Sequence, residues 1–364
     1  MERWAAEALR RALDKVAAQR NLSGYPHIVD HGQWVLTPDG AWTGGFWIGL
    51  LWALYEEGGD ATVREQAERL LQGFLTRAGE RTNHDLGFMF CPSAVAGWQI
   101  TGEERYRAAA LEAAASLAAQ FHPRGRFIPG WGFFGGQEWQ GRVLIDTLMN
   151  LPLLLWAAAQ TGEQRYREVA LAHADTTVRY HLRPDGSTYH VYRFEPESGA
   201  PIGGDTYQGR APESCWSRGQ AWALTGLTLL AKATGKDRYR AAAHRAAGYY
   251  LAHLPADHIP PWDFDVPVAA GPRDSSAAAI AAFGLLRLAA LSADPAYAQT
   301  ARETLHALGT GYMAAPAEPA ILLHATADLP HGFGVNASTI YGDYFFMRAL
   351  QTLRGTPVRT GGCL

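Results

Sequence analysis

The segment GRVLIDTLMNLPLLLWAAAQTGEQRYREVAL, residues 141–171, decides the fold. Its first part, 141–159, is apolar on nearly every side, which predicts a buried helix. Thr161 and Gly162 then predict a tight turn, because glycine suits the position just after a helix. The last part has Arg and Glu residues along one face, which predicts a surface helix. The segment is therefore a predicted pair of helices, one buried and one at the surface.

The same unit recurs along the chain. TGEERYRAAAL begins at Thr101 and TGKDRYRAAAH at Thr234, with weaker copies from Glu56 and Ser292. The pattern predicts surface helices at about 2–20, 61–78, 103–120, 163–181, 237–254 and 295–309, and buried helices at about 44–56, 88–100, 144–159, 219–233, 275–291 and 338–352. Six buried helices inside six surface helices predict an all-α fold, an (α/α)6 barrel. No composition break divides residues 1–364, so we expect one catalytic domain and exclude Rossmann and TIM folds.

The connections between the predicted helices differ in length. Links from buried to surface helices are short TG turns, whereas most links from surface to buried helices are long: 21–43, 121–143, 182–218, 255–274 and 310–337. In an alternating barrel, all the long links lie at the same end. Because long loops without regular structure are usually functional, we expect the active site at that end.

Composition excludes several classes of function. Hydrophobic residues make up 48% of the chain, charged residues 18%, and the net charge is −3, with no basic cluster suited to nucleic acid. Uncharged runs of about 12 or 13 residues are too short to span a membrane. Three cysteines without a CxxC pair predict a reducing compartment and no metal site. The charged N-terminal helix lacks the apolar region of a signal peptide, so we expect a cytoplasmic protein.

Two aspartates are candidates for acid–base chemistry. Asp146 lies among apolar residues near the start of a predicted buried helix. Desolvation raises a carboxyl pKa, which lets an enzyme keep a proton on an aspartate and transfer it to a substrate. Asp85 lies in NHDLGF, beside His84, just before another buried helix. The alternative for both aspartates is a structural role as a helix cap.

The long loops supply polar and aromatic side chains that suit sugar binding. The candidates are Trp42, Trp131, His190, Gln208, Trp216, Arg218 and Trp222. The aromatic residues can stack on sugar rings or fold into a small core. A lone histidine in a short predicted strand is more often structural than catalytic, and that alternative applies to His190. Arg218 needs an anionic partner, either a protein acid or a substrate carboxylate.

Two further acids start buried helices near the C-terminus. Asp274, followed by Ser275 and Ser276, is a predicted helix cap. Asp343 lies in an aromatic helix start, and we expect it to pair with an arginine across the ring.

The ordered set of motifs resembles a known enzyme family. NHDLGFMF, LIDTLMNLPLL, YHV, TYQG, SCWSRGQAW, PRDSSAAA and IYGDYFF occur in that order on the predicted hairpins. Together they resemble the unsaturated glucuronyl hydrolases, glycoside hydrolase family 88, over nearly the whole chain. The resemblance implies an (α/α)6 barrel hydrolase that acts on the unsaturated uronate left by polysaccharide lyases at a non-reducing end.

The resemblance also implies roles for the candidate residues. Asp146 would be the general acid and base, and Asp85 would bind sugar hydroxyls and influence the proton on Asp146. The first subsite would be lined by His84, His190, Gln208, Trp216, Arg218 and Trp222, with Trp42 and Trp131 stacking. No cofactor or metal is implied, and we expect a monomer or a weak homodimer.

One motif departs from the family pattern, and other classes of function compete. Some family members carry serines or a lysine that contact the uronate carboxylate or a sulfate, but DLPHGFGVNAST, residues 328–339, has no lysine. The nearest competitor is the unsaturated rhamnogalacturonyl hydrolase family, family 105, whose arginine motif is RGNGW-like. A sugar 2-epimerase would transfer protons with histidines such as His190 and His331. The third alternative is a catalytically inactive sugar-binding protein.

Overall fold

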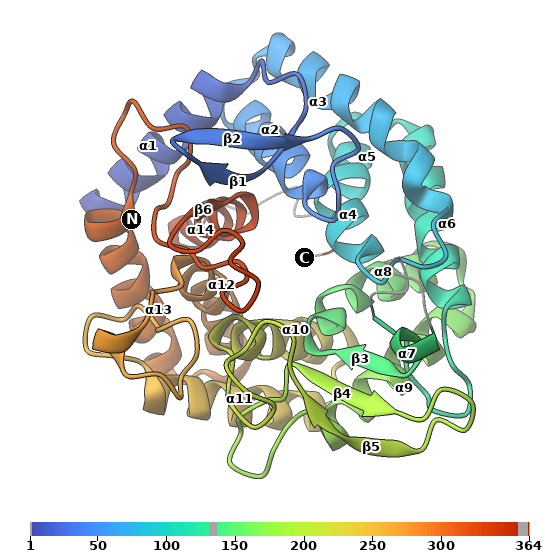
Figure 1. The fold of residues 1–364 in the computed structure, drawn as a ribbon. Coiled ribbons are helices and arrows are strands. Elements are labelled where there is room, and N and C mark those ends of the chain that lie inside the picture. The colour runs from blue at the N-terminus through green and yellow to red at the C-terminus, as the bar shows by residue number, and fades with distance from the viewer. Residues whose placement is uncertain (1, 131–136, 356–362, 364) are drawn as a thin grey trace.

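Helices form two concentric rings in the computed structural model, which describes residues 2–130, 137–355 and 363 (Figure 1). The inner ring comprises α2 (Gly44–Gly58), the run α4–η2–α5 (Leu86–Phe90, Cys91–Val95 and Ala96–Thr101), α8 (Leu151–Thr161), α10 (Ser217–Thr234), α12 (Ser275–Ser292) and α14 (Ile340–Arg354). The outer ring comprises α1 (Arg3–Gln19), α3 (Ala61–Phe74), α6 (Glu104–Ala119), α9 (Gln164–Tyr180), α11 (Asp237–His253) and α13 (Pro295–Ala307). The predicted (α/α)6 barrel is confirmed.

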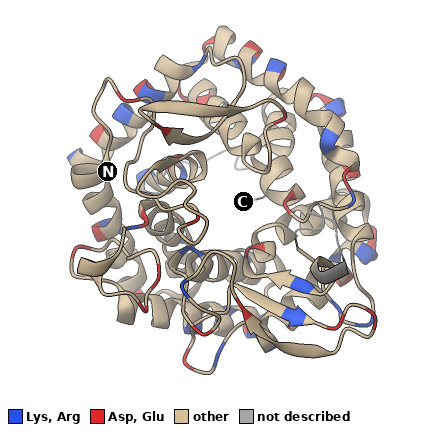
Figure 2. Ribbon diagram, in the orientation of Figure 1, with Lys and Arg blue, Asp and Glu red and all other residues tan. Residues whose placement is uncertain are grey.

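The burial of each helix follows from its sequence. In α3, the buried residues are Val63, Ala67, Leu70, Leu71 and Phe74, whose spacing places them on one helix face. In α12, by contrast, every residue from 275 to 285 is buried. Figure 2 shows the charged residues mainly on the outer helices and loops, with both signs interspersed. An outer helix therefore needs one apolar face, while an inner helix needs apolar residues all round.

The recurrent turn ends the inner helices as predicted. Gly59, Gly102, Gly162 and Gly235 have φ between 65° and 78°, the left-handed region that glycine adopts without strain. Each backbone N–H bonds back to a carbonyl four residues earlier. Ala293 takes the same conformation in the weaker copy, at φ 56°.

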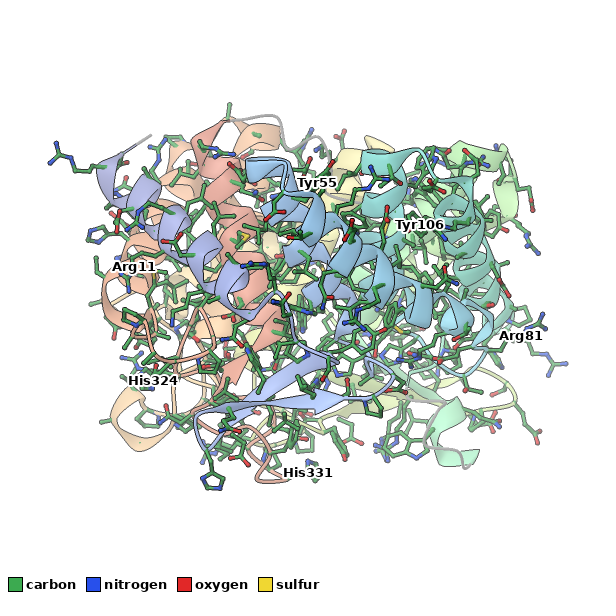
Figure 3. All side chains as sticks on the ribbon, turned by 90° about the horizontal axis from the view of Figure 1, so that it is seen from above. Arg11, Tyr55, Arg81, Tyr106, His324 and His331 are labelled. Carbon is green, nitrogen blue, oxygen red and sulfur yellow. A yellow bond between two sulfur atoms is a disulfide. The ribbon has the colours of Figure 1, made fainter. Side chains whose placement is uncertain are left out.

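Strands occupy the long connections, all at one end of the ring. One antiparallel sheet has the order β2 (Gln33–Thr37), β1 (Tyr25–Asp30), β6 (Ser338–Thr339). A second has the order β3 (Arg142–Leu144), β4 (Val191–Phe194), β5 (Pro201–Asp205), and β4 begins directly after His190, in the region of the short predicted strand. In the side view, the β1–β2 hairpin and His331 lie at one end, while Tyr55, near the end of an inner helix, lies at the other (Figure 3). The long connections therefore share one end, as expected.

The predicted helix over 144–159 is wrong at its start. Strand β3 ends at Leu144, a 3₁₀ turn, η4, covers Ile145–Met149, and α8 begins only at Leu151. Two features explain this late start. The N–H of Ile145 donates to His190 O at 3.0 Å, which ties the chain to β4. Pro152 lacks an N–H and is therefore tolerated only in the first turn of a helix.

The cysteine prediction also needs correction. Cys91, in an inner helix, and Cys363 form a disulfide across 272 residues, with a Cα–Cα distance of 5.1 Å. Cys215 is free and buried. Two cysteines so far apart in sequence cannot be recognised as a pair from their spacing. The prediction of a reducing compartment therefore depended only on the small, odd number of cysteines and the absence of a CxxC pair. The bond removes the support for that prediction.

One described helix is long and apolar enough to cross a membrane. It is α12, but 67% of it is buried within the structure. Its apolar character is that of a core helix in the inner ring.

Candidate active site

A cavity of about 260 Å³ opens at the loop end of the ring. Its wall combines inner-helix starts with loop residues: His27, Trp42, His84, Asp85, Phe88, Asp146, Tyr207, Gln208, Trp216, Arg218, Trp222, Ala327, Asp328, Phe333 and Tyr341. Eight of the predicted site residues are in this wall. His190 lies behind it, with its ring 4.4 Å from that of Trp216. Trp131 lies outside the described residues.

Two carboxylates and an imidazole meet on one side of the cavity. His84 Nε2 lies 3.4 Å from Asp85 Oδ1 and 3.4 Å from Asp146 Oδ1. The His84 side chain is 1% exposed, that of Asp85 9% and that of Asp146 14%. Asp146 is thus the member of this cluster with the most contact with the open space.

The turn before α4 positions Asp85. Although Asp85 occupies the N-cap position, its side chain caps nothing, so the capping alternative is wrong. Its Oδ1 lies 3.4 Å from Asn150 Nδ2 instead, and Asn150 Oδ1 accepts the N–H of Phe88 at 2.7 Å. A Cβ at Gly87 would lie 2.3 Å from Asn150 Cα. The absence of a side chain at Gly87 therefore lets the two hairpins approach closely and bring Asp85 toward Asp146.

Burial and charge together set the protonation of this cluster. Burial raises the pKa of Asp85 to about 6; the charge of His84 opposes this rise and that of Asp146 adds to it. Burial alone would lower the pKa of His84, but the negative charges of Asp85 and Asp146 outweigh it and raise that pKa above its usual value. The cluster can therefore hold and release a proton close to neutral pH.

The histidine beside the cluster is held neutral. Burial lowers the pKa of His190 to about 3. Its Nδ1 accepts the backbone N–H groups of Tyr207 and Gln208, each at 3.2 Å, so the ring proton resides on Nε2. This histidine fixes the 206–208 loop at the cavity wall and is a poor proton acceptor at neutral pH.

The anionic partner of Arg218 is a protein acid. Arg218 Nη1 donates to Asp274 Oδ2 at 2.6 Å, in a pair that is 2% and 0% exposed. Arg218 also donates to the carbonyl groups of Thr326 and Ala327. Asp274 accepts from the N–H of Ser276, which confirms the predicted cap. The substrate-carboxylate alternative for Arg218 is therefore not needed to explain its burial.

The partner predicted for Asp343 is wrong. Its carboxylate accepts the backbone N–H groups of Ile321 and Leu322, at 2.9 and 2.8 Å, and pairs with no arginine in the described chain. Burial raises the pKa of Asp343 to about 7. Backbone groups brought near by folding gave no signal in the sequence.

Aromatic rings form much of the remaining wall. Trp42 stacks on Tyr341 with ring centroids 5.1 Å apart, and Trp222 lies 4.9 Å from Phe88. Sequence reasoning did not name the other seven wall residues as site residues: His27, Phe88, Tyr207, Ala327, Asp328, Phe333 and Tyr341. Five of them lie in motifs compared with the family pattern, namely NHDLGFMF, TYQG, DLPHGFGVNAST and IYGDYFF, but the sequence does not show that their side chains face a cavity.

The acid–imidazole cluster is also the group of described residues that could hold a metal. Donor atoms of His84, Asp85 and Asp146 all lie within 4.8 Å of one another. A proton on His84 Nε2, between the two carboxylates, supplies the positive charge that such a pair of acids requires. The absence of a metal cofactor stays a prediction.

Comparison with known proteins places these features in a family. Residues 12–257 match glycosyl hydrolase family 88. An unsaturated glucuronyl hydrolase of Bacillus sp. (strain GL1) is 39% identical over 341 residues, 90% of each chain. An unsaturated chondroitin disaccharide hydrolase of Streptococcus pyogenes is 35% identical over 87% of this chain and 82% of its own.

Solved structures of the same family have a similar fold. The unsaturated glucuronyl hydrolase from Bacillus sp. GL1, described as responsible for the degradation of glycosaminoglycan, superposes with a TM-score of 0.92 at 38% identity, over 96% of this chain and 97% of that one. An unsaturated glucuronyl hydrolase described as specific for heparin superposes with a TM-score of 0.92 at 32% identity, over 99% of this chain and 100% of that one.

Proposed function

Because the chain belongs to glycosyl hydrolase family 88, we propose that it removes a 4,5-unsaturated uronic acid from the non-reducing end of oligosaccharides made by polysaccharide lyases. The observation that supports this most is the cluster of Asp146, His84 and Asp85 beside an aromatic cavity. The cluster provides a proton donor beside aromatic side chains on which a sugar ring can stack.

The substrate has an unusual reactivity that suits one acid. Its C4=C5 bond is an enol ether, since the ring oxygen is attached to C5. A proton added to C4 leaves positive charge shared by C5 and the ring oxygen. Water then adds to C5 and gives up a proton. The resulting hemiketal opens and releases the remaining sugar, so no protein group attacks the glycosidic carbon.

Asp146 is the proposed general acid and base. Of the clustered side chains it is the one most exposed to the cavity, so a sugar carbon can approach its carboxyl. It donates a proton to C4 and takes one back from the water that adds to C5. The proton balance closes over one turnover, and the usual rule that relates carboxylate separation to stereochemistry does not apply.

Asp85 and His84 are proposed to supply and retain the proton. The raised pKa of Asp85, about 6, reflects burial and the nearby charge of Asp146, opposed by His84. His84 Nε2 is equally close to both acids, so it can stabilise whichever one is ionised. Asn150 holds Asp85 through the contact at 3.4 Å. We propose that Asp85 also binds sugar hydroxyls.

The rest of the wall is proposed to bind the reacting sugar. Trp42 offers a stacking face, while Gln208, whose Nε2 donates to Ala327 O at 2.9 Å, is held at the rim. Trp216, Trp222 and Arg218 shape the floor, with Arg218 acting through Asp274 and the 326–327 backbone. Trp131 remains a predicted stacking residue, and His190 a positioning residue for the 206–208 loop.

Two competing functions lose support. The family match is to family 88 rather than to the rhamnogalacturonyl hydrolases of family 105. An epimerase needs histidines that exchange protons, but the pKa of His190 is lowered by burial to about 3. His331 is engaged with Asp328 at 2.8 Å at the cavity rim. Neither histidine lies in the acid cluster.

A spectroscopic assay tests the proposed function. Unsaturated disaccharides absorb ultraviolet light through the conjugated double bond, and hydration removes that absorbance. We expect absorbance to fall with release of a reducing sugar, and the product formed in D₂O to carry one deuteron at C4. Binding or epimerisation leaves the absorbance intact, and that result contradicts the proposal. Chondroitin, hyaluronan, heparin and gellan fragments compared side by side identify the substrate.

We also propose that residues 1–364 form one catalytic domain that acts as a monomer or weak homodimer. The predicted cytoplasmic location is not part of this proposal, because the Cys91–Cys363 bond argues against a strongly reducing compartment. The state of these thiols is tested below.

A further inference from the structure

A cavity of about 570 Å³ lies at the end of the ring opposite the active site. Its described wall comes from α8, from the last turns of α10, from the first turn of α9 and from Arg287 in α12. Cys363 also lines it and is fixed there by its bond to Cys91. Because these parts of the chain adjoin the short TG turns, at the end that Tyr55 marks in Figure 3, we call it the turn-end cavity.

The charged groups that line the turn-end cavity are cations. They are Arg167, Lys232 and Arg287, and the described lining contains no Asp or Glu. The printed contacts of Arg287 are with neutral acceptors, since its Nη1 lies 3.4 Å from Phe283 O and 3.3 Å from Thr352 Oγ1. The cavity therefore presents positive charge that the surrounding wall does not neutralise.

A second buried arginine lies near Arg287. Burial and the like charge of Arg348 lower the pKa of Arg287 to about 9, opposed by Tyr344. Arg348 is 3% exposed, and its Nη2 has no hydrogen-bond partner among the described residues. Buried cations without a paired anion are costly. An anion bound in the turn-end cavity would offset that cost.

The acids around this cavity have other partners or face elsewhere. The pairs are Glu163–Arg165 at 3.1 Å, Asp237–Arg240 at 2.7 Å and Glu57–Arg354 at 2.8 Å. Glu168 is exposed and, as the neighbour of Arg167 in sequence, does not share its helix face. Glu56 is not among the charges that shift the pKa of Arg287. The described chain therefore supplies no carboxylate to the lining of the turn-end cavity.

The uncharged part of the wall suits the organic part of a ligand. Trp156 is half-buried and offers an indole ring, and its Nε1–H has no acceptor among the described residues. Leu155 and Leu229 add apolar contacts, and the exposed Gln164 adds an amide. The volume of about 570 Å³ is within the range of about 300–1,000 Å³ that binds small ligands.

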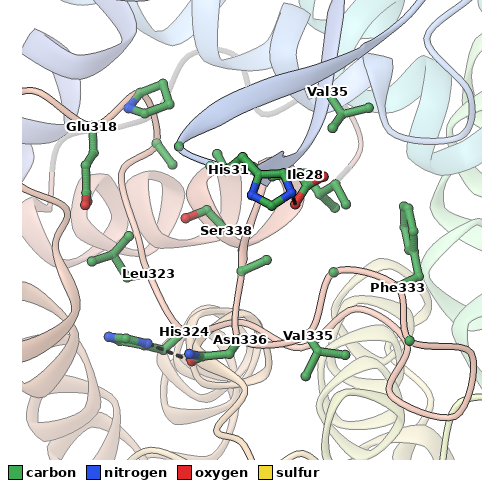
Figure 4. Close-up of a pocket in the computed structure, with 18 residues that line it drawn as sticks. Ile28, His31, Val35, Glu318, Leu323, His324, Phe333, Val335, Asn336 and Ser338 are labelled. Atoms are coloured by element: carbon green, nitrogen blue, oxygen red, sulfur yellow. Dashed lines mark hydrogen bonds and ion pairs between the residues drawn. The ribbon is translucent and has the colours of Figure 1, made fainter.

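A larger cavity at the loop end differs in its charge. It measures about 660 Å³, lies between the β1–β2 hairpin and residues 318–338, and includes the acids Asp30 and Glu318 in its lining (Figure 4). Lys15 donates to backbone carbonyl oxygens on its border, including that of Glu318. Phe333 lines both this cavity and the catalytic one, so the two share one face of the molecule. The turn-end cavity is on the other face, away from the bound substrate.

We propose that the turn-end cavity binds a small organic phosphate. A phosphate ester carries a charge of about −1.5 to −2 at pH 7 and three acceptor oxygens, which suits several cations better than a single carboxylate does. An arginine fork can bind two of those oxygens at once. The apolar wall and the indole then contact the organic part. The inference does not depend on the proposed function, because the turn-end and catalytic cavities share no described residue.

Calorimetry with the intact protein at constant ionic strength tests this site. We expect glucose 6-phosphate to bind, inorganic phosphate to bind at least about threefold more weakly because it makes no apolar contacts, and glucose not to bind. At a hundred times its Kd, glucose 6-phosphate should raise the melting temperature of the 364-residue chain by about 3–4 °C. Equal affinity for the two phosphates overturns the assignment of an organic ligand, and no binding of either overturns the site.

Variants locate the binding within the molecule. Arg287→Met and Arg167→Met should each weaken the binding of glucose 6-phosphate by at least about tenfold, the effect of one charge-assisted hydrogen bond. Arg179→Met is the matched control, because Arg179 is an exposed arginine of the same helix, α9, outside the lining. Without ligand, Arg287→Met should melt no lower than the wild type, because Arg348 then loses a like charge. Unchanged affinity in both variants, or a large loss of stability in unliganded Arg287→Met, overturns the inference.

Discussion

Replacing Arg218 by methionine tests how the floor of the catalytic cavity is built. Arg218 pairs with Asp274 at 2.6 Å, where both side chains are almost fully buried. The same guanidinium group binds the carbonyl oxygens of Thr326 and Ala327, next to Asp328 in the cavity wall. Methionine fills similar space but leaves the Asp274 carboxylate buried without its cation.

The expected cost follows from this burial. Removal of one partner from a buried ion pair costs about 3–5 kcal/mol. Unfolding entropy near 2.1 cal/mol/K per residue gives about 0.8 kcal/mol/K for 364 residues. The variant should therefore melt about 4–7 °C below the wild type. Arg238 and Asp175 form an exposed pair, 48% and 41% exposed, so Arg238→Met should cost less than about 1 kcal/mol.

Thermal and urea unfolding, with a double-mutant cycle, provide the assay. We expect Asp274→Asn in the Arg218→Met background to restore part of the lost stability, because it removes the unpaired charge. If Arg218 instead binds the substrate carboxylate directly, Arg218→Met raises KM strongly and leaves the melting temperature within about 1 °C of the wild type. That second pattern refutes the structural role described above.

Three further predictions concern the disulfide, the acid cluster and the close helix contact. Denatured protein prepared without reductant should show one reactive thiol; three would disprove the Cys91–Cys363 bond. Because the raised pKa of Asp85 is about 6, the cluster loses a proton as pH rises through that value, so kcat should fall above it. Asp85→Asn should change the pH at which kcat falls. A kcat that stays constant from pH 5 to 8 would contradict the assignment of this fall to Asp85. Gly87→Ala, whose Cβ would lie 2.3 Å from Asn150 Cα, should destabilise by about 1–3 kcal/mol and slow turnover; an unchanged melting temperature refutes that contact.

The ring was predictable because its signals are local. The TG turns and the contrast between apolar and one-faced helices depend on residues close together in sequence, and they predicted all twelve helical segments, with most boundaries within a few residues of the observed ones. The start of α8 was missed because a long-range bond from Ile145 to His190 O overrides the helical pattern. The helix prediction therefore failed where a strand from another hairpin pairs with the chain.

The candidate site was predictable in part. The wall residues near helix starts, including Asp85 and Asp146, were found because each precedes or enters an apolar run. The partner of Arg218, 56 residues away, and the contribution of Phe333 depend on how the loops fold over the ring. Such contacts leave no periodic pattern in the sequence.

The rate at which Asp146→Asn consumes the double bond tests the central claim most directly. Asparagine has the same shape but no carboxyl proton to donate, so we expect the loss of ultraviolet absorbance to slow by at least about 10²-fold while the melting temperature stays near that of the wild type. An undiminished rate would contradict the assignment of Asp146 as the proton donor.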